Sequence, residues 1–190
     1  PVDVAIGNFT SGGGTDVAVV NSGDSTVIIL GSTALRSNPF GSGDPIPMDI
    51  GGTTIDPTDV NDPKDLDSMI VSGRGEGRVA VIKGEEGLRG YDSIDYYDVG
   101  NSPYEAAVGD LNGDSLADIV TADFDDGTIS VLIQNVDGTY QGAAAIEVGL
   151  PIDEPHPRSI ALGDYDSDGD LDVAVVILEV GGTLVRTLRN

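Results

Sequence analysis

The chain has 190 residues, of which 39% are hydrophobic, and this is enough for a continuous core in one large domain or in part of a larger one. It carries 33 acidic and 9 basic residues, a formal net charge of -24, which argues against nucleic-acid and anionic-membrane surfaces because both need clustered Lys and Arg. Cations are therefore the expected partners. The absence of cysteine excludes disulfides, thiolate metal sites and cysteine nucleophiles.

Membrane insertion and processing are also constrained. No apolar run approaches the roughly 18 residues that a membrane span needs, and no signal peptide is present, so we expect no membrane insertion. The chain opens on Pro1 without a methionine, which favours a mature or excised product. Part of the acidic excess also fits a solvated surface that only keeps the protein soluble.

One pattern occurs four times along the chain: an apolar alternation, a polar loop, and an Asp that opens a second apolar run. The polar loops open at Asn8, Asp59, Asp110 and Asp164. They close at Asp16, Asp67, Asp118 and Asp172, so that by subtraction successive units are 51, 51 and 54 residues apart. We therefore predict a single repeat region over residues 1–190, with repeats at approximately 1–51, 52–102, 103–156 and 157–190.

Each unit is predicted to contain four short antiparallel strands, because its apolar runs alternate with turn residues and no stretch has a sustained helical period. In the third unit the strands are expected at residues 104–109, 118–122, 128–134 and 143–149. Four such strands recurring at this spacing are typical of β-propeller blades. The predicted fold is all-β, with four blades of four-stranded antiparallel sheet, the last of them incomplete.

The first two loops differ from the other two in their acidic residues. "NFTSGGGTD" keeps only Asn8, Thr10 and Asp16 beside three glycines, so we predict that it holds no metal. "DVNDPKDLD" places Pro63 at its fifth position, and we predict it as a weaker metal loop. Its candidate ligands are Asp59, Asn61, Asp65 and Asp67.

The third and fourth loops place oxygen-bearing side chains at alternate positions, so that an extended loop can curl around a hard cation. Calcium is the expected ion, since it prefers about six to eight oxygen ligands. The candidate ligands of the third loop are Asp110, Asn112, Asp114, Leu116 and Asp118. Those of the fourth loop are Asp164, Asp166, Asp168, Asp170 and Asp172. Leu116 is expected to contribute its backbone carbonyl, because its side chain has no ligand atom.

Electrostatic repulsion also favours a cation in these loops, because two carboxylates about 4 Å apart repel by roughly 4 kcal/mol at an effective dielectric constant near 20. An EF-hand loop is a competing pattern, but its acidic ligand at position 12 would be Val175, inside an apolar run, so that alternative fails. Asx-turns without metal remain the structural alternative. We expect two calcium sites, with a third possible in the second unit.

Few other residues indicate chemistry. His156 has no serine, cysteine or second histidine arranged with it, so a structural role is expected. "GRGEGR", residues 73–78, lacks the Lys-Ser/Thr ending of a phosphate loop and is predicted to be a hairpin turn. Four tyrosines could stack on sugars, although packing against strands is the stronger expectation. These are Tyr91, Tyr96, Tyr97 and Tyr104.

With these residues in view, the sequence resembles the FG-GAP/VCBS repeat family, the calcium-loop β-propeller repeats of integrin α-subunit heads and of many bacterial secreted proteins. "AVGDLNGDSLADIVTADFDDGTISVLIQNVDGTY" is similar to nearly a whole repeat, and "ALGDYDSDGDLDVAVV" is similar to the metal loop of the family. The resemblance implies calcium between the first two strands of a blade, at the loop positions named above. Ser115 is a departure, since the family usually has Gly there.

The number of units sets a further expectation. Propeller rings of this family usually have about seven blades, which is more than the four units found here. Aligning "GTLVRTLRN" with "GTISVLIQN" places Asn190 at the position of Asn135, so that the fourth unit lacks its outer strand. We therefore expect an excerpt of a longer protein, or a subunit whose neighbours cover the open edges.

These observations predict a calcium-binding scaffold, adhesion or protein-interaction module that is not an enzyme. The resemblance places it outside the cell or at the cell surface, in a bacterium. The alternative function is carbohydrate recognition, either as a lectin or as the propeller of a polysaccharide-degrading enzyme. The sequence does not identify the protein or glycan partner.

Overall fold

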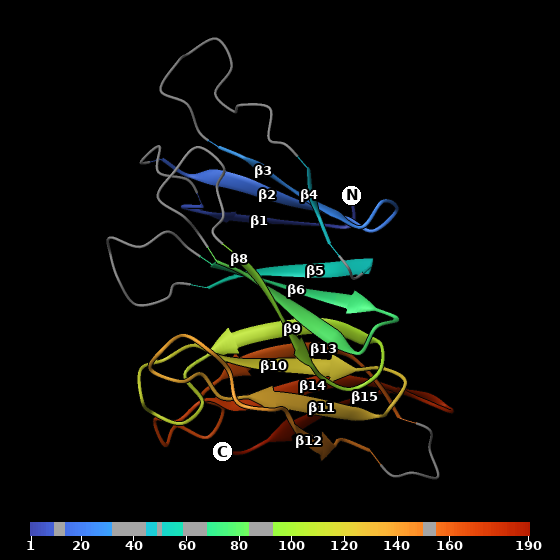
Figure 1. Ribbon diagram of the computed structural model, residues 1–190. Helices are drawn as coiled ribbons and strands as arrows, with labels where there is room; N and C mark the ends of the chain where they lie inside the picture. The colour runs from blue at the N-terminus through green and yellow to red at the C-terminus, as the bar shows by residue number, and fades with distance from the viewer. Residues whose placement is uncertain (10–13, 32–44, 49–50, 59–67, 84–92, 150–154) are drawn as a thin grey trace.

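The computed structural model describes residues 1–9, 14–31, 45–48, 51–58, 68–83, 93–149 and 155–190, and for residues 51–58 and Arg74 it describes the backbone alone. Within these ranges the chain consists of β-strands, turns and loops (Figure 1). No helix in the described part of the chain is long and apolar enough to cross a membrane. The predicted all-β fold is confirmed.

The strands form four antiparallel sheets, which follow one another along the chain and are called blades 1 to 4. Blade 1 contains β1 (Asp3–Gly7), β2 (Asp16–Asn21), β3 (Thr26–Leu30) and β4 (Pro45–Pro47). Blade 2 contains β5 (Gly51–Thr58), β6 (Ser68–Arg74), β7 (Arg78–Lys83) and β8 (Ser93–Asp98). Blade 3 contains β9 (Pro103–Gly109), β10 (Asp118–Asp123), β11 (Thr128–Leu132) and β12 (Ala144–Glu147). Blade 4 contains β13 (His156–Gly163), β14 (Asp172–Glu179) and β15 (Gly182–Leu188).

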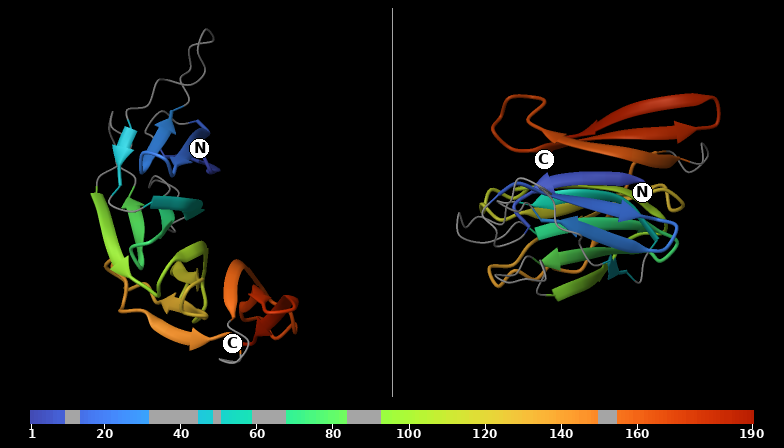
Figure 2. Two further views of the ribbon diagram at one scale, coloured as in Figure 1. Left: turned by 90° about the vertical axis from the view of Figure 1, so that its right-hand side faces the viewer. Right: turned by 90° about the horizontal axis from the view of Figure 1, so that it is seen from above.

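The four blades are arranged along an arc that does not close into a ring (Figure 2). Within each blade the strands pair in sequence order, and the first strands of neighbouring blades, such as β9 and β13, contact one another. The strands predicted for the third unit are all found, with ends that differ by at most two residues. This arrangement confirms propeller blades in an incomplete ring, with a last blade of three strands.

The core lies between successive blades, and this explains why the middle strands are apolar on both faces. Met69 and Ile70 are neighbours on β6 and point to opposite faces of blade 2, yet both are fully buried. Met69 packs between blades 1 and 2, whereas Ile70 packs between blades 2 and 3. Val175 belongs to the equivalent layer between blades 3 and 4.

The two ends of the arc carry apolar surface that no blade covers. Val4 and Ile6 on β1, and Val2 just before it, are 57%, 64% and 52% exposed, whereas Ala5 on the opposite face of β1 is buried against blade 2. At the other end of the arc, Val185 on β15 is 63% exposed. The outer faces of the terminal blades therefore resemble in composition the faces that the inner blades bury.

One turn can be compared with the sequence analysis. The predicted hairpin at residues 73–78 is found, since β6 ends at Arg74, β7 begins at Arg78, and Gly75 and Gly77 between them have positive φ angles of 108° and 58°. Positive φ angles of this kind favour glycine, because it has no Cβ.

The strand register changes the alignment of blades 3 and 4 by one residue. Leu132 pairs with Ile119 and Leu188 pairs with Val173, so Leu188 is the counterpart of Leu132. Asn190 therefore corresponds to Gln134 and not to Asn135. The β14–β15 hairpin is two residues longer than the β10–β11 hairpin. Aligning the two Gly-Thr pairs without a gap allows for only one of these residues, so the alignment is wrong by one position.

Candidate functional site

The two acidic loops join the first two strands of blades 3 and 4, at the same end of both blades (Figure 1). Loop 3 is defined as residues 110–118 and loop 4 as residues 164–172. The candidate ligands of the second unit, Asp59, Asn61, Asp65 and Asp67, lie outside the described residues, as do Thr10 and Tyr91. Loops 3 and 4 are described throughout.

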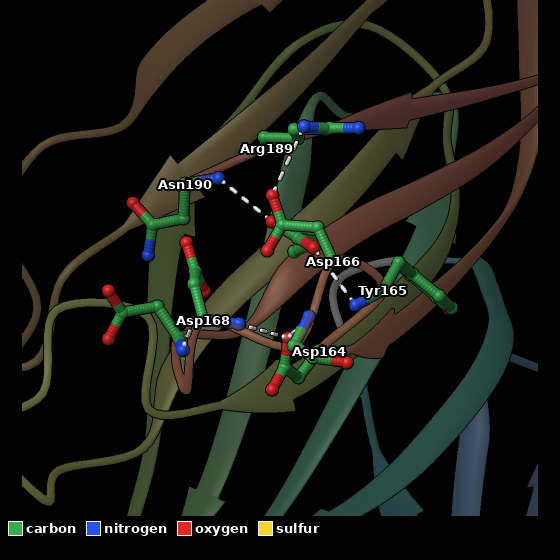
Figure 3. Close-up of polar contacts among 9 residues, drawn as sticks. Asp164, Tyr165, Asp166, Asp168, Arg189 and Asn190 are labelled. Carbon is green, nitrogen blue, oxygen red and sulfur yellow. Dashed lines mark hydrogen bonds and ion pairs between the residues drawn. The ribbon is translucent and has the colours of Figure 1, made fainter.

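Loop 4 brings three of its five predicted ligands together. One carboxylate oxygen from each of Asp164, Asp166 and Asp172 lies within 4.8 Å of the other two, and Figure 3 shows the loop from which they come. No other group of three acidic or histidine side chains is this close within the described part of the chain. Asp164 shapes the loop by accepting hydrogen bonds from the backbone N–H groups of Ser167 and Asp168, at 2.6 and 3.2 Å.

The other two predicted ligands of loop 4 lie outside this group. Asp168 accepts a hydrogen bond from the backbone N–H of Asp170 at 3.1 Å, as an Asx-turn does, and both side chains are exposed. The alternation of aspartates therefore has two roles here. Some carboxylates converge, and others stabilise the turn.

Among the described residues, one ion pair involves this group. Arg189 forms an ion pair with Asp166, with 3.3 Å between Nη1 and Oδ2. Partial burial, together with the negative charges of Asp168 and Asp172, nevertheless raises the pKa of Asp166 above its ordinary value, and Arg189 opposes that shift. A raised pKa means that the cluster disfavours its own negative charge, and a bound cation would relieve this.

Loop 3 has a similar backbone but does not gather three carboxylates. Asp110 accepts hydrogen bonds from the N–H groups of Gly113 and Ser115, both at 2.8 Å. The amide of Asn112 donates to Asp114 at 2.9 Å, so this pair is satisfied within the loop. That the backbone carbonyl of Leu116 is a ligand stays a prediction.

The aspartates that close the loops have a structural role that the sequence analysis missed. Asp16, Asp118 and Asp172 are all buried, including the one in the loop predicted to hold no metal. Asp118 accepts hydrogen bonds from the backbone N–H groups of Leu111 and Gln134, at 3.0 and 2.8 Å. Burial raises the pKa of Asp118, and these two hydrogen bonds oppose the shift. The residue therefore ties the start of its loop to the backbone just after the third strand of its blade.

Asn190 has the corresponding position in blade 4 and adds a link between the two loops. Its backbone N–H donates to Asp172 at 3.0 Å, as that of Gln134 does to Asp118. Its side-chain amide donates to the backbone carbonyl of Leu111 in loop 3. Figure 3 shows Asn190 beside loop 4, and its bond to Leu111 connects the acidic-loop ends of blades 3 and 4.

Each loop also contains two residues with positive φ, at matching positions. In loop 3 these are Gly113 and Ser115, with φ angles of 77° and 67°. In loop 4 they are Ser167 and Gly169, with φ angles of 67° and 102°. Ser115, which stands where the family usually has Gly, therefore adopts the left-handed conformation that favours glycine.

His156 lies at the junction of blades 3 and 4, at the end opposite the acidic loops. Its ring stacks on Phe124, with 4.5 Å between the ring centroids and 13° between the planes. Its Nδ1 lies 2.8 Å from the backbone carbonyl of Phe124, and because a carbonyl only accepts, Nδ1 carries the hydrogen. This geometry gives His156 a packing role between the two blades.

The described candidate tyrosines also have partners within the chain. The guanidinium of Arg158 lies over the ring of Tyr104 at 4.9 Å, and that of Arg78 lies over Tyr96 at 5.2 Å. Tyr97 contacts Tyr140 edge to face, with ring centroids 5.2 Å apart. Packing of these rings therefore accounts for their places in the strands.

The donor set of loop 4 fits a hard cation. It offers carboxylate oxygens and no soft ligand, it converges within one loop, and the one ion pair it makes with the described residues is to an exposed arginine. Loop 3 offers the same kinds of atoms, but Asn112 and Asp114 are bonded to each other. If either loop binds calcium, loop 4 is the better prepared of the two.

A comparison with solved structures finds the same fold. One crystal structure, of BBS1N in complex with ARL6DN and soaked with lead, matches with a TM-score of 0.62 and 13% identity, over 98% of this chain and 55% of that one. A crystal of the same complex soaked with mercury matches with a TM-score of 0.60 and 17% identity, over 100% of this chain and 56% of that one. The chain thus spans little more than half the length of the chains it matches.

Comparisons of the sequence give one family match. No curated protein matches the chain. The model of the FG-GAP-like repeat family matches residues 110–175, a range that begins with loop 3 and includes all of loop 4. Residues 110–175 are therefore FG-GAP-like repeat sequence, within a chain folded as β-propeller blades.

Proposed function

We propose that this chain is a calcium-stabilised β-propeller module that binds a protein partner, without catalytic activity of its own. The observation that carries the proposal is the convergence of Asp164, Asp166 and Asp172 within 4.8 Å in loop 4. Oxygen ligands of this kind are those that calcium prefers in proteins. When bound, the ion would supply positive charge that offsets the mutual repulsion of the carboxylates.

An extracellular or cell-surface location is part of the proposal. A site with a dissociation constant of about 10 to 100 µM would be filled at millimolar calcium, and mass action would then stabilise the fold by roughly 1.4 to 2.7 kcal/mol. In a compartment with little calcium, the same loop would remain empty. A net charge of -24 further favours a compartment that is rich in divalent cations.

Two observations support a protein partner. BBS1N, whose fold matches, was crystallised in complex with ARL6DN, so a propeller of this shape presents a surface that binds a protein. The exposed apolar faces at Val4 and Val185 are of the kind that protein contacts cover. Further blades of a longer chain, or of neighbouring subunits, are proposed to cover these two end faces.

The absence of catalysis is part of the proposal. His156 is held by Phe124, and the convergent carboxylates of loop 4 are assigned to a metal. A polysaccharide substrate turned over by the purified chain would contradict this part of the proposal.

Thermal unfolding in EDTA and in millimolar calcium tests the metal, with magnesium as a control because its octahedral preference suits these loops less well. We expect calcium to raise the melting temperature by several degrees in the wild type, and by less in Asp166→Asn. The matched control is Asp170→Asn, which makes the same charge change in the same loop but outside the convergent group, and its calcium response should equal that of the wild type. Equal responses to calcium and magnesium, or none to either, would contradict the proposal.

A further inference from the structure

Arg189 lies beside loop 4 and pairs with one of the three convergent carboxylates. Its Nη1 is 3.3 Å from Oδ2 of Asp166, and the pair is drawn in Figure 3. The arginine side chain is 73% exposed, whereas that of Asp166 is 24% exposed. The guanidinium can therefore move into water, while the carboxylate is largely covered by the loop.

Blade 3 lacks both members of this pair. The register makes Leu188 the counterpart of Leu132, so the residue that corresponds to Arg189 is Ile133. At the third position of the loop, Asp166 is replaced by Asn112. The opening, fifth and closing positions are aspartates in both loops. Asp166 and Arg189 thus occur together in blade 4, and blade 3 has neither the acid nor the base at these two positions.

We propose that Arg189 is an internal counter-ion of loop 4, which pairs with Asp166 when the loop holds no cation and lowers the affinity of the loop for calcium. This inference rests on the proposed binding of calcium. A cation that uses the carboxylate of Asp166 has to displace the guanidinium, and the displaced Arg189 then becomes a free basic group on an acidic surface. Loop 4 therefore needs a higher calcium concentration to bind the ion than it would need without Arg189.

The expected size of the effect follows from Coulomb's law. In a water-like dielectric, two unit charges roughly 3 Å apart attract each other strongly enough that a cation which must first separate them binds about tenfold more weakly. Because the arginine is exposed, salt screens the interaction, and the effect shrinks once the Debye length falls to about 3 Å near 1 M salt.

Isothermal titration of the full chain with calcium measures this directly. Asp110→Asn in loop 3 provides the parent, so that the titration reports mainly on loop 4. In low salt, Arg189→Gln should bind calcium about tenfold more tightly than the parent, and Arg189→Lys should stay within about twofold of it. Lys83→Gln is the matched control, because it removes the same charge from a pair with Asp95 on blade 2, and its affinity should not change.

A second pair of variants tests whether Asp166 is the group through which Arg189 acts. In an Asp166→Asn background, Arg189→Gln should change the affinity by less than about twofold, because the partner carboxylate is gone. A full tenfold gain in that background would overturn the counter-ion role and indicate general charge. Calcium binding that is unchanged by Arg189→Gln would overturn this inference alone. Failure of every variant to bind calcium would overturn the proposed function as well.

Discussion

Blades 3 and 4 present the same loop scaffold with different charges. In both, the opening aspartate accepts N–H groups from its own loop, and the closing aspartate, Asp118 or Asp172, is buried and accepts the N–H of the residue that follows the third strand. The third position differs, with Asn112 in one loop and Asp166 in the other. The aspartates shared by the two loops set the loop shape, and the third position changes the charge without changing that shape, so a loop of this shape is not in itself a metal site.

The largest expected effect concerns the scaffold. Asp118→Ala would leave the buried N–H groups of Leu111 and Gln134 without an acceptor, and we expect a loss of about 2 to 4 kcal/mol in the free energy of unfolding. Asp172→Ala should cost less, because the N–H groups that it would release are only partly buried. Urea denaturation in EDTA measures both.

The exposed Glu147 on β12 supplies the control for these two variants, since Glu147→Ala should change the free energy of unfolding by less than about 0.5 kcal/mol. If Asp118→Ala proved as mild as this control in EDTA, the closing aspartate would be a metal ligand only, and the separation of shape from charge would be wrong.

The second prediction concerns charge. Asp164→Asn should remove most of the stabilisation by calcium, roughly 1.4 to 2.7 kcal/mol at millimolar calcium, whereas Asp110→Asn should remove less. The reason is that loop 4 gathers three carboxylates and loop 3 does not. Unfolding curves of the two variants, with and without calcium, give the comparison. A calcium response that disappears in Asp110→Asn but persists in Asp164→Asn would reverse the order of the two loops.

The repeat made the fold predictable from the sequence. Period, alternation and turn residues located the blades and the ends of the blade 3 strands, and the alternating aspartates marked the loops. The convergence of Asp164, Asp166 and Asp172, and the exclusion of Asp168 and Asp170, could not be predicted, because alternation gives positions along an extended chain and the loop is curled by hydrogen bonds to Asp164.

The partners from the third strand were missed for a different reason. Arg189 and Asn190 reach loop 4 through the register of β14 and β15, and the longer hairpin between those strands shifts the alignment by one residue. An alignment that allowed for this hairpin would have placed the amide residues Gln134 and Asn190 at the same position after the third strand. Ile133, which corresponds to Arg189, is uncharged, so the blade 3 repeat does not indicate a role for this position.

At the other end of the blades, a buried acid distinguishes blade 3 from blade 4. Asp123 is fully buried and accepts hydrogen bonds from the hydroxyls of Thr121 and Ser130, at 2.7 and 2.6 Å, whereas its counterpart in blade 4 is the apolar Ile177. Burial raises the pKa of Asp123 above its ordinary value, although these hydroxyls oppose the shift. The folded state therefore binds the proton more tightly than the unfolded state.

The consequence for stability has a definite sign. As the pH falls through the raised pKa of folded Asp123, this residue should increase the free energy of unfolding, by up to about 1.4 kcal/mol for each unit that separates the folded and unfolded pKa values. Asp123→Asn should lack this contribution. Urea denaturation of the wild type and of Asp123→Asn between pH 7 and pH 4, in EDTA, measures this contribution. The wild type should gain free energy of unfolding relative to the variant as the pH falls. A difference that moves in the opposite direction would mean that the hydroxyl donors outweigh burial.

The smallest expected effect tests the backbone of the two loops. Gly169 in loop 4 has a φ of 102°, whereas its counterpart Ser115 has a φ of 67°, which is close to the left-handed well that non-glycine residues can occupy. A Cβ at Gly169 would meet no atom within 4 Å, so Gly169→Ser would introduce strain without a clash, and we expect it to cost about 1 kcal/mol in EDTA. Gly142→Ser is the control, because that glycine also has open space around it but no positive φ. Equal stability of the two variants would mean that loop 4 relaxes to the conformation of loop 3, and the difference between the loops would then be one of charge alone.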